Sequence, residues 1–154
     1  MAGDEQVRAL VKRFAEASQS RQAVELTEDE CWRLLGTVSL GRIVFTRRAL
    51  PAIRPVNHLT DGQAIIVRSH LGADIVAHAS DDGAVVCYEA DELDPDRHTG
   101  WSVIATGLAS LVREPVRVAR YREMLNPWIM GQMDYVLEIR PQIITGIHLA
   151  GWCR

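Results

Sequence analysis

Hydrophobic and polar positions follow two different periods along this chain, one helical and one strand-like. Residues 6–17 place apolar side chains three or four positions apart, which predicts a short amphipathic helix, and the polar run after it predicts a linker. Beyond residue 40, runs of β-branched residues are separated by turn signals, which is typical of strands. We therefore assign residues 1–25 to an N-terminal helix and linker, and residues 26–154 to one mainly β domain.

The domain is predicted to open with a helix at residues 26–36 (LTEDECWRLLG). Thr27 and Glu30 have the spacing of a capping box, in which each side chain satisfies a backbone amide of the first turn. Leu26 and Cys31 are placed as a hydrophobic staple, and Gly36 can end the helix. This segment carries both a start signal and a stop signal.

Seven strands and two more helices are predicted after this helix. The strands are expected at residues 42–46, 52–59, 63–69, 84–90, 102–113, 134–140 and 143–149, and the helices at residues 72–79 and 115–125. Asp61-Gly62 predicts a tight hairpin turn between the second and third strands. So many strands without alternating helices favour a β-barrel or sandwich with peripheral helices over a parallel sheet.

The composition argues against several kinds of partner and site. A chain of 154 residues is long enough for one domain with a real hydrophobic core, and its net charge of -3 gives no argument for nucleic acid. No apolar run approaches the roughly 20 residues that a membrane helix needs, and the N-terminus lacks a signal-peptide pattern. We therefore expect a cytoplasmic protein with neither a nucleic-acid nor a membrane partner. The three widely spaced cysteines indicate neither a disulfide framework nor a metal site.

Two arginines stand inside stretches that otherwise resemble buried strands. Arg54 precedes Pro55, which cannot donate a ladder hydrogen bond, so this strand is predicted to be an edge or to be irregular there. Backbone groups near Arg54, Val56 and Asn57 would then be available to a ligand. The alternative is a purely structural role, in which Arg54 and Arg68 reach solvent at strand ends and pair with acidic neighbours.

The third predicted strand ends in Arg68, Ser69 and His70, just before Gly72 at the start of a predicted helix. A guanidinium, a hydroxyl and helix N-terminal amides could together hold one phosphate. Of the five histidines, His70 is the best placed to contribute to such a phosphate site. A surface role is nevertheless the commoner explanation for any one histidine.

A polar, acidic loop is predicted to lead into Trp101 and Ser102 at the start of a long apolar strand. The indole could provide a flat face for a planar cofactor, or it could close one end of a barrel core. The acidic residues of this loop do not have EF-hand spacing, so a solvated surface is favoured over a metal site. Dinucleotide-binding, P-loop and hydrolase motifs are absent from the sequence.

Four segments in one order resemble the pyridoxamine 5'-phosphate oxidase-like family of split β-barrel flavoproteins, and more narrowly its nitroimidazole-resistance-type bacterial branch. They are GRIVF, LPAIRPVNHLTDGQAIIVRS, YEADELDPDRHTGWSVIATGLA and LEIRPQIITG, within residues 26–151. The resemblance implies a homodimer of split barrels of the FMN-binding-protein type. Flavin mononucleotide (FMN) would lie in grooves at the subunit interface and serve an oxidoreductase acting on a small molecule.

The resemblance also implies roles for individual residues. Residues 54–57 would run along the isoalloxazine ring, Arg68 and Ser69 would hold the phosphate, and Trp101 and Ser102 would approach the ring from the same subunit or its partner. We include His70 with the phosphate end because of its position.

Two departures from the family pattern leave the cofactor open. Asp74 stands where family members often carry a phosphate-binding lysine, and Ile147 replaces the arginine of a closing Gly-Arg pair. An acid would repel a phosphate unless it points away. The alternatives are therefore a non-catalytic protein that binds or senses flavin, deazaflavin F420 or haem, or a structural dimer with an empty groove.

Overall fold

The computed structural model describes residues 23–76, 83–125 and 135–150. The helix predicted at residues 6–17 lies outside these ranges, as do residues 77–79 of the helix predicted at 72–79, and Cys153. The strands are β1 (Ala23–Glu25), β2 (Leu40–Arg47), β3 (Leu50–Asp61), β4 (Ala64–Ser69), β5 (Ala84–Asp94), β6 (Thr99–Leu111) and β7 (Tyr135–Leu149). The helices are α2 (Glu28–Leu35), α3 (Gly72–Val76) and α4 (Pro115–Met124).

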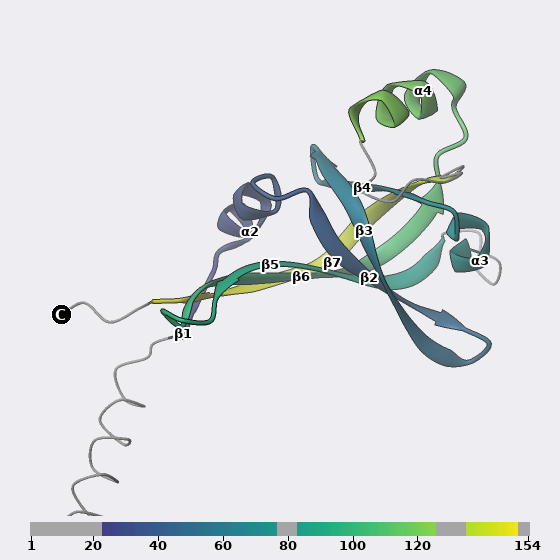
Figure 1. The fold of residues 1–154 in the computed structure, drawn as a ribbon. Coiled ribbons are helices and arrows are strands. Elements are labelled where there is room, and N and C mark those ends of the chain that lie inside the picture. Colours follow the sequence, from purple (N-terminus) through teal and green to yellow (C-terminus); the bar gives the residue numbers. More distant parts are fainter. Residues whose placement is uncertain (1–22, 77–82, 126–134, 151–154) are drawn as a thin grey trace, which may run out of the picture.

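The strands form one antiparallel sheet that closes on itself into a barrel, which confirms the predicted fold class. Their order is β1-β7-β4-β3-β2-β5-β6, and β6 pairs again with β7 (Figure 1). The predicted hairpin between β3 and β4 is also present, because Asp61 lies opposite Ala64 and Gly62 has a φ of +61°. The turn is centred one residue later than predicted.

One continuous strand, β7, replaces the two strands predicted on either side of Pro141, so that prediction was wrong. On β6, Gly107 lies opposite Pro141 and Thr106 lies opposite Ile143, with a register shift between them. Gln142 is therefore the extra residue of a β-bulge. Proline cannot donate a ladder hydrogen bond, and a bulge is a place in a strand where that bond can be missing. The strand therefore bends at Pro141 and continues.

The predicted acidic loop before Trp101 is also mostly strand. β5 and β6 pair without interruption from Ala84 opposite Ala109 to Asp94 opposite Thr99. The acidic side chains therefore line a long hairpin, because cross-strand pairing overrides their low intrinsic strand preference. The predicted linker likewise contains β1, which pairs with β7 at Ala23 opposite Leu149.

Helix α2 begins as the sequence predicts. The Thr27 hydroxyl accepts a hydrogen bond from the Glu30 amide at 3.3 Å, and the Glu30 carboxylate accepts one from the Thr27 amide at 2.8 Å. These bonds hold the pKa of Glu30 below its usual value. Gly36 caps the other end in a right-handed conformation with φ of -73°, so glycine is not required there for its backbone freedom.

Two apolar clusters hold the fold together. The larger one fills the barrel and includes Ile43, Ile65, Tyr88 and Val103, all fully buried. The smaller one lies between α4 and the outer face of β4, where Ile66 meets Tyr121 and its neighbours. Among the described residues, no helix is long and apolar enough to cross a membrane.

Candidate functional site

β3 has an open edge over most of its length. Residues 50–57 of β3 pair with β2, but pairing with β4 begins only at His58, opposite Val67. Within the described part of the chain, no strand pairs with the other edge of residues 50–57. Pro55 lies in this open stretch, as the sequence predicts, because an edge strand loses nothing by its missing N–H.

The direction of the backbone groups along this edge follows from the strand register. The His58 amide donates toward β2, to the Ser39 carbonyl at 2.9 Å. Since alternate residues of a strand present their backbone groups to opposite sides, Ile53, Pro55 and Asn57 present theirs to the open edge. Val56, which the sequence singled out, presents its amide to β2 instead.

The side chains of this stretch divide into buried and exposed groups. Val56 and Asn57 are buried, and the Asn57 amide group donates to the Ser39 carbonyl at 3.2 Å. Arg54 is exposed and folds back along the edge, where it donates to the Ile53 carbonyl at 2.6 Å. A guanidinium therefore lies beside an accessible row of backbone carbonyls.

Arg68 and Ser69 leave β4 on opposite faces, because successive strand side chains alternate. Ala64 and Ile66 share the face of Arg68 and pack in the α4 cluster. Arg68 accordingly reaches the carbonyl of Arg122 at 3.4 Å, at the end of α4. The Ser69 side chain is buried and accepts a hydrogen bond from the Leu71 amide at 3.0 Å. His70, next in sequence, is exposed.

Asp74 does not stand as an isolated acid near this end of the barrel. Its carboxylate lies 3.3 Å from the guanidinium of Arg47, at the end of β2. Both side chains are about half exposed, so the pair contributes little stability, but it neutralises the acid locally. Arg47 thus brings a positive charge to the place from which the family's lysine is missing. The helix that carries Asp74, α3, is only five residues long.

Trp101 and Ser102 lie at the far end of the barrel from Ser69. Ser69 lies opposite Tyr135 on β7, whereas Trp101 lies opposite His148, near the other end of the same strand. A strand rises about 3.3 Å per residue, so the two ends are separated by roughly 40 Å along β7. Within one protomer, Trp101 and Ser102 therefore lie far from Ser69 along the sheet. Trp101 is buried, and the Ser102 hydroxyl donates to Glu89 at 3.3 Å.

A buried histidine–tyrosine pair lies next to the open stretch and was missed by the sequence reasoning. The Tyr88 hydroxyl donates to His58 Nδ1 at 2.6 Å, and His58 Nε2 donates to the Leu35 carbonyl at 2.8 Å. The carbonyl can only accept, which assigns the proton to Nε2. Burial lowers the pKa of His58 and raises the pKa of Tyr88, so both stay neutral.

This pair should make stability fall in mild acid. Below about pH 6.5 the unfolded chain protonates His58 while the folded chain does not, so the unfolded state binds more protons and the unfolding free energy decreases as pH falls. The slope should approach about 1.4 kcal/mol per pH unit at most. Urea unfolding between pH 5 and 7 measures it. His58→Gln should flatten this dependence, and an equal slope in both proteins would contradict the assignment.

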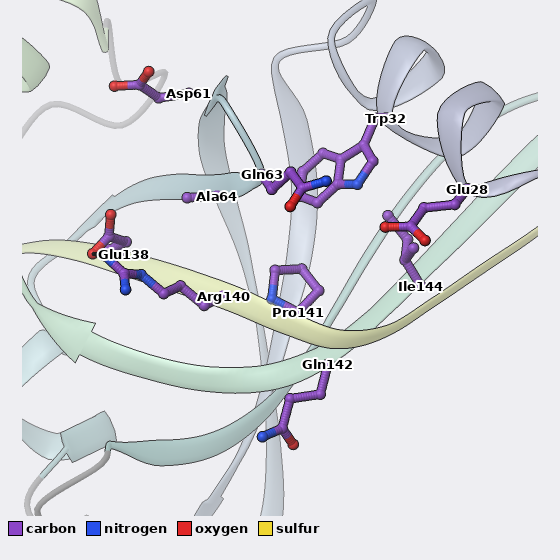
Figure 2. A pocket seen from close by; sticks show the side chains of 10 residues that line it. All are labelled: Glu28, Trp32, Asp61, Gln63, Ala64, Glu138, Arg140, Pro141, Gln142 and Ile144. Atoms are coloured by element: carbon purple, nitrogen blue, oxygen red, sulfur yellow. Dashed lines mark ion pairs between the residues drawn. The ribbon is translucent and has the colours of Figure 1, made fainter.

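A cleft of about 440 Å³ opens elsewhere, between α2, the β3–β4 hairpin and β7 (Figure 2). Its lining residues are Glu28, Trp32, Asp61, Gln63, Ala64, Glu138, Arg140, Pro141, Gln142 and Ile144. None of the predicted site residues lines it. Its carboxylates on the strands are engaged, since Asp61 accepts from the Tyr121 hydroxyl at 2.7 Å and Glu138 pairs with Arg117 at 2.8 Å.

No group of three or more metal-ligating side chains occurs in the part of the chain that the structure describes.

Arg47 is another residue that the sequence did not reveal as a candidate, because its pairing with Asp74 joins positions 27 residues apart and leaves no local signal. His58 and Tyr88 did leave one, since each is a polar residue at a core-facing position of an apolar strand.

Comparison with known proteins identifies relatives along most of the chain. A model of the pyridoxamine 5'-phosphate oxidase family matches residues 27–148. The uncharacterised protein Rv0080 of Mycobacterium tuberculosis is 52% identical over 140 residues, which cover 89% of this chain and 92% of that protein.

Two solved structures are similar in fold and in sequence. A provisionally assigned pyridoxamine 5'-phosphate oxidase from Corynebacterium glutamicum has a TM-score of 0.69 and 32% identity, over 82% of this chain and 98% of that one. An FAD-binding protein from Mycobacterium smegmatis has a TM-score of 0.61 and 28% identity, over 84% of this chain and all of that one.

Proposed function

The chain belongs to the pyridoxamine 5'-phosphate oxidase family, and we propose that it is a flavin-binding oxidoreductase that holds FMN against the open edge of β3. A bound flavin would supply the redox chemistry by accepting and donating electrons, and the protein would supply orientation and charge. The observation that carries the proposal is the edge of residues 50–56 that faces away from β2, with Arg54 lying along it.

The residues at this edge suit a planar ring with a polar rim. Backbone groups of Ile53, Pro55 and Asn57 face outward, and they lie on a strand that pairing with β2 holds rigid. The ring would lie along residues 54–57, with its polar rim on this backbone. A small organic substrate would stack on the ring's other face.

We propose that Arg68 and Ser69 hold the phosphate end, with His70 nearby, as the sequence predicts. The Arg47–Asp74 pair supports an anion there, because the acid is already neutralised. Since Arg68 and Ser69 leave β4 on opposite faces, their contributions can be separated by mutation.

We further propose that the active form is a homodimer. Ser69 and Trp101 lie at different levels of β7, opposite Tyr135 and His148, which supports a second copy as the source of Trp101 and Ser102 at the site. The outer face of the sheet also exposes Ile53, Val85 and Ile143, with 53%, 70% and 63% of their surfaces accessible. Apolar exposure of this extent is typical of an interface.

A non-catalytic carrier or sensor of flavin, F420 or haem is the second candidate. It is favoured by the absence of a basic residue at position 74 and by the lack of an identifiable acid or base at the open edge. Turnover separates the two candidates: an oxidoreductase should consume a nicotinamide donor while reducing a quinone or nitroaromatic, whereas a carrier should bind without turnover.

Titration of the purified protein tests cofactor binding directly. FMN, FAD, riboflavin, F420 and haem are added separately, and flavin fluorescence or absorbance gives each dissociation constant. FMN should bind more tightly than riboflavin, which lacks the phosphate. Equal affinities would contradict a phosphate site, and no binding of any of the five would contradict a cofactor role.

Arg68→Ala should weaken FMN binding by about 10- to 150-fold, because a charge-assisted hydrogen bond contributes roughly 1.5 to 3 kcal/mol. Riboflavin affinity should stay unchanged, since the lost contact is to the phosphate. Arg33→Ala, on the exposed face of α2, is the matched control and should bind FMN as the wild type does. Equal FMN affinity in Arg68→Ala and wild type would remove Arg68 from the site.

A further inference from the structure

An apolar groove of about 330 Å³ lies at one end of the sheet, where the β5–β6 hairpin turns. Its lining includes Leu93, Pro95, Leu149 and Ala150. Leu93 on β5 and Leu149 on β7 both lie opposite Gly100 on β6, so the three residues share one row and one face of the sheet. Gly100 has no side chain, and the two leucines therefore flank an open space. Leu93 is 52% exposed.

Gly100 is the residue that keeps this space open. Its φ is +133°, a backbone conformation that residues with side chains rarely adopt, and a Cβ there would collide with the Glu92 carbonyl oxygen. The groove therefore follows from the backbone at the start of β6, not from the rotamer of one adjustable side chain.

The chain enters β1 beside this groove. Ala23 lies opposite Leu149, and β1 runs from there toward Glu25, which lies opposite Ile147. Neighbouring strands are about 4.8 Å apart, so the first residue of β1 is one strand spacing from the groove. Figure 1 shows β1 beside the end of the β5–β6 hairpin. The segment before residue 23 is thus tethered at the groove.

The segment before β1 has an apolar face of its own. Residues 6–17 are predicted to form an amphipathic helix, with apolar side chains on one face at Val7, Leu10, Val11 and Phe14. A helix of this length is only marginally stable alone in water, so that face needs a surface to pack on. Residues 18–22 join it to β1, and this link spans at most about 20 Å when extended. The groove is within this reach.

The tip of the β5–β6 hairpin adds negative charge at the rim of the groove. Residues 91–97 hold four acidic residues and one arginine, a formal charge of -3: Asp91, Glu92, Asp94, Asp96 and Arg97. Asp91 lies 3.5 Å from Arg42, and Asp94 lies 3.7 Å from Arg97. Glu92 and Asp96 are exposed and make no ion pair with the described residues. Their carboxylates can therefore meet a cationic partner.

The predicted helix carries the opposite charge. Residues 6–17 hold three basic residues and one acid, a formal charge of +2: Arg8, Lys12, Arg13 and Glu16. At helical spacing, Arg8 and Lys12 lie one turn apart on one flank of the apolar face, whereas Glu16 lies on the opposite side. An apolar face with a basic flank thus matches an apolar groove with an acidic rim.

We propose that the groove is the docking site of this chain's own N-terminal segment, residues 6–17, bound within the same subunit. The apolar face of the segment covers the two leucines, and its basic flank faces Glu92 and Asp96. A short tether gives an effective concentration on the order of millimolar, so the contact forms even where the free segment would bind weakly. The docked segment holds the hairpin tip against the start of β1, and this role does not depend on flavin binding.

Hydrogen–deuterium exchange of the full chain tests the docking on the groove. The readout is the exchange rate of the amides of residues 6–17, measured by mass spectrometry on peptic fragments. Leu93→Asp places a charge in the groove, so these amides should exchange at least about tenfold faster than in the wild type. Val116→Asp, at an α4 position that is 74% exposed, is the matched control and should leave the wild-type rates unchanged. Amides of β4, remote from the groove, report in the same spectra whether each variant is folded. Equal rates in Leu93→Asp and wild type would overturn the proposal.

Charge-reversed variants test the orientation and identify the subunit that supplies the groove. Arg8→Glu with Lys12→Glu, and Glu92→Lys with Asp96→Lys, each place like charges together, so exchange should be faster by about threefold or more. One chain that carries all four substitutions should regain the slow exchange, because opposite charges face each other again. An equimolar mixture of the two double variants should stay fast, since each tethered segment reaches only its own groove. Slow exchange in the mixture would show docking on a second copy. That result, or a chain with all four substitutions that stays fast, would refute the proposal.

Discussion

Trp101→Ala should lower the free energy of unfolding by about 3–5 kcal/mol, the range for removing a large buried aromatic side chain from a core. The indole of Trp101 is only 6% exposed and belongs to the barrel core, although it lies near one end of β6. The loss combines transfer of the ring to water with the cavity left among its neighbours. Urea denaturation at one fixed protein concentration measures it.

The same variant distinguishes the two roles that the sequence left open for this residue. If Trp101 mainly closes the core, Trp101→Phe should recover most of the stability, because it refills most of the volume. If the indole only touched a cofactor, Trp101→Ala would change flavin affinity and leave stability intact. Val116→Ala is the control, since this α4 side chain is 74% exposed and its removal should cost under about 0.5 kcal/mol.

Gly41→Ala should destabilise the protein by about 3 kcal/mol, at the upper end for overpacking a core. A Cβ at this position of β2 would lie 2.2 Å from the Tyr88 hydroxyl oxygen and 2.5 Å from the Glu89 carbonyl oxygen. The Glu89 carbonyl belongs to the backbone of the paired strand β5, so it cannot move aside without a large cost in free energy. The added methyl group also pushes against the hydroxyl that donates to His58.

Gly36→Ala is the matched control for this substitution. Its Cβ would meet nothing closer than 3.5 Å, and its φ of -73° is accessible to alanine. The substitution should therefore be neutral or stabilise the protein by up to about 1 kcal/mol, because alanine restricts the unfolded chain. Thermal unfolding of both variants tests the pair. Similar midpoints would show that the space beside Gly41 is not needed for Tyr88.

Features with a local cause were predictable from the sequence. The capping box of Thr27 and Glu30, the hairpin after Asp61 and the edge position of Pro55 each depend on neighbouring residues or on one missing N–H. The family resemblance supplied the barrel, and the match over residues 27–148 confirms the family.

Predictions failed where a partner strand overrides local preference. Pro141 was expected to end a strand, but pairing with β6 continues through a bulge. The acidic run after Glu89 was expected to be a loop, but five consecutive pairs with β6, from Ala90 opposite Val103 to Asp94 opposite Thr99, hold it extended. Gly107, which lies opposite Pro141, is 34 residues away in sequence, and the β5–β6 hairpin forms despite the low strand preference of its acidic residues, so the local pattern revealed neither outcome.

The sequence by itself determined the strand-rich class, the start of α2 and the residue types available to a site, because these follow from side-chain chemistry and short-range periodicity. Only the tertiary structure decided that Arg68 and Ser69 face opposite ways, that Asp74 meets Arg47 and that Trp101 lies far from Ser69. Those facts depend on strand register and barrel closure. Register is set by cooperative hydrogen bonding and core burial between distant segments, which no single stretch of sequence encodes.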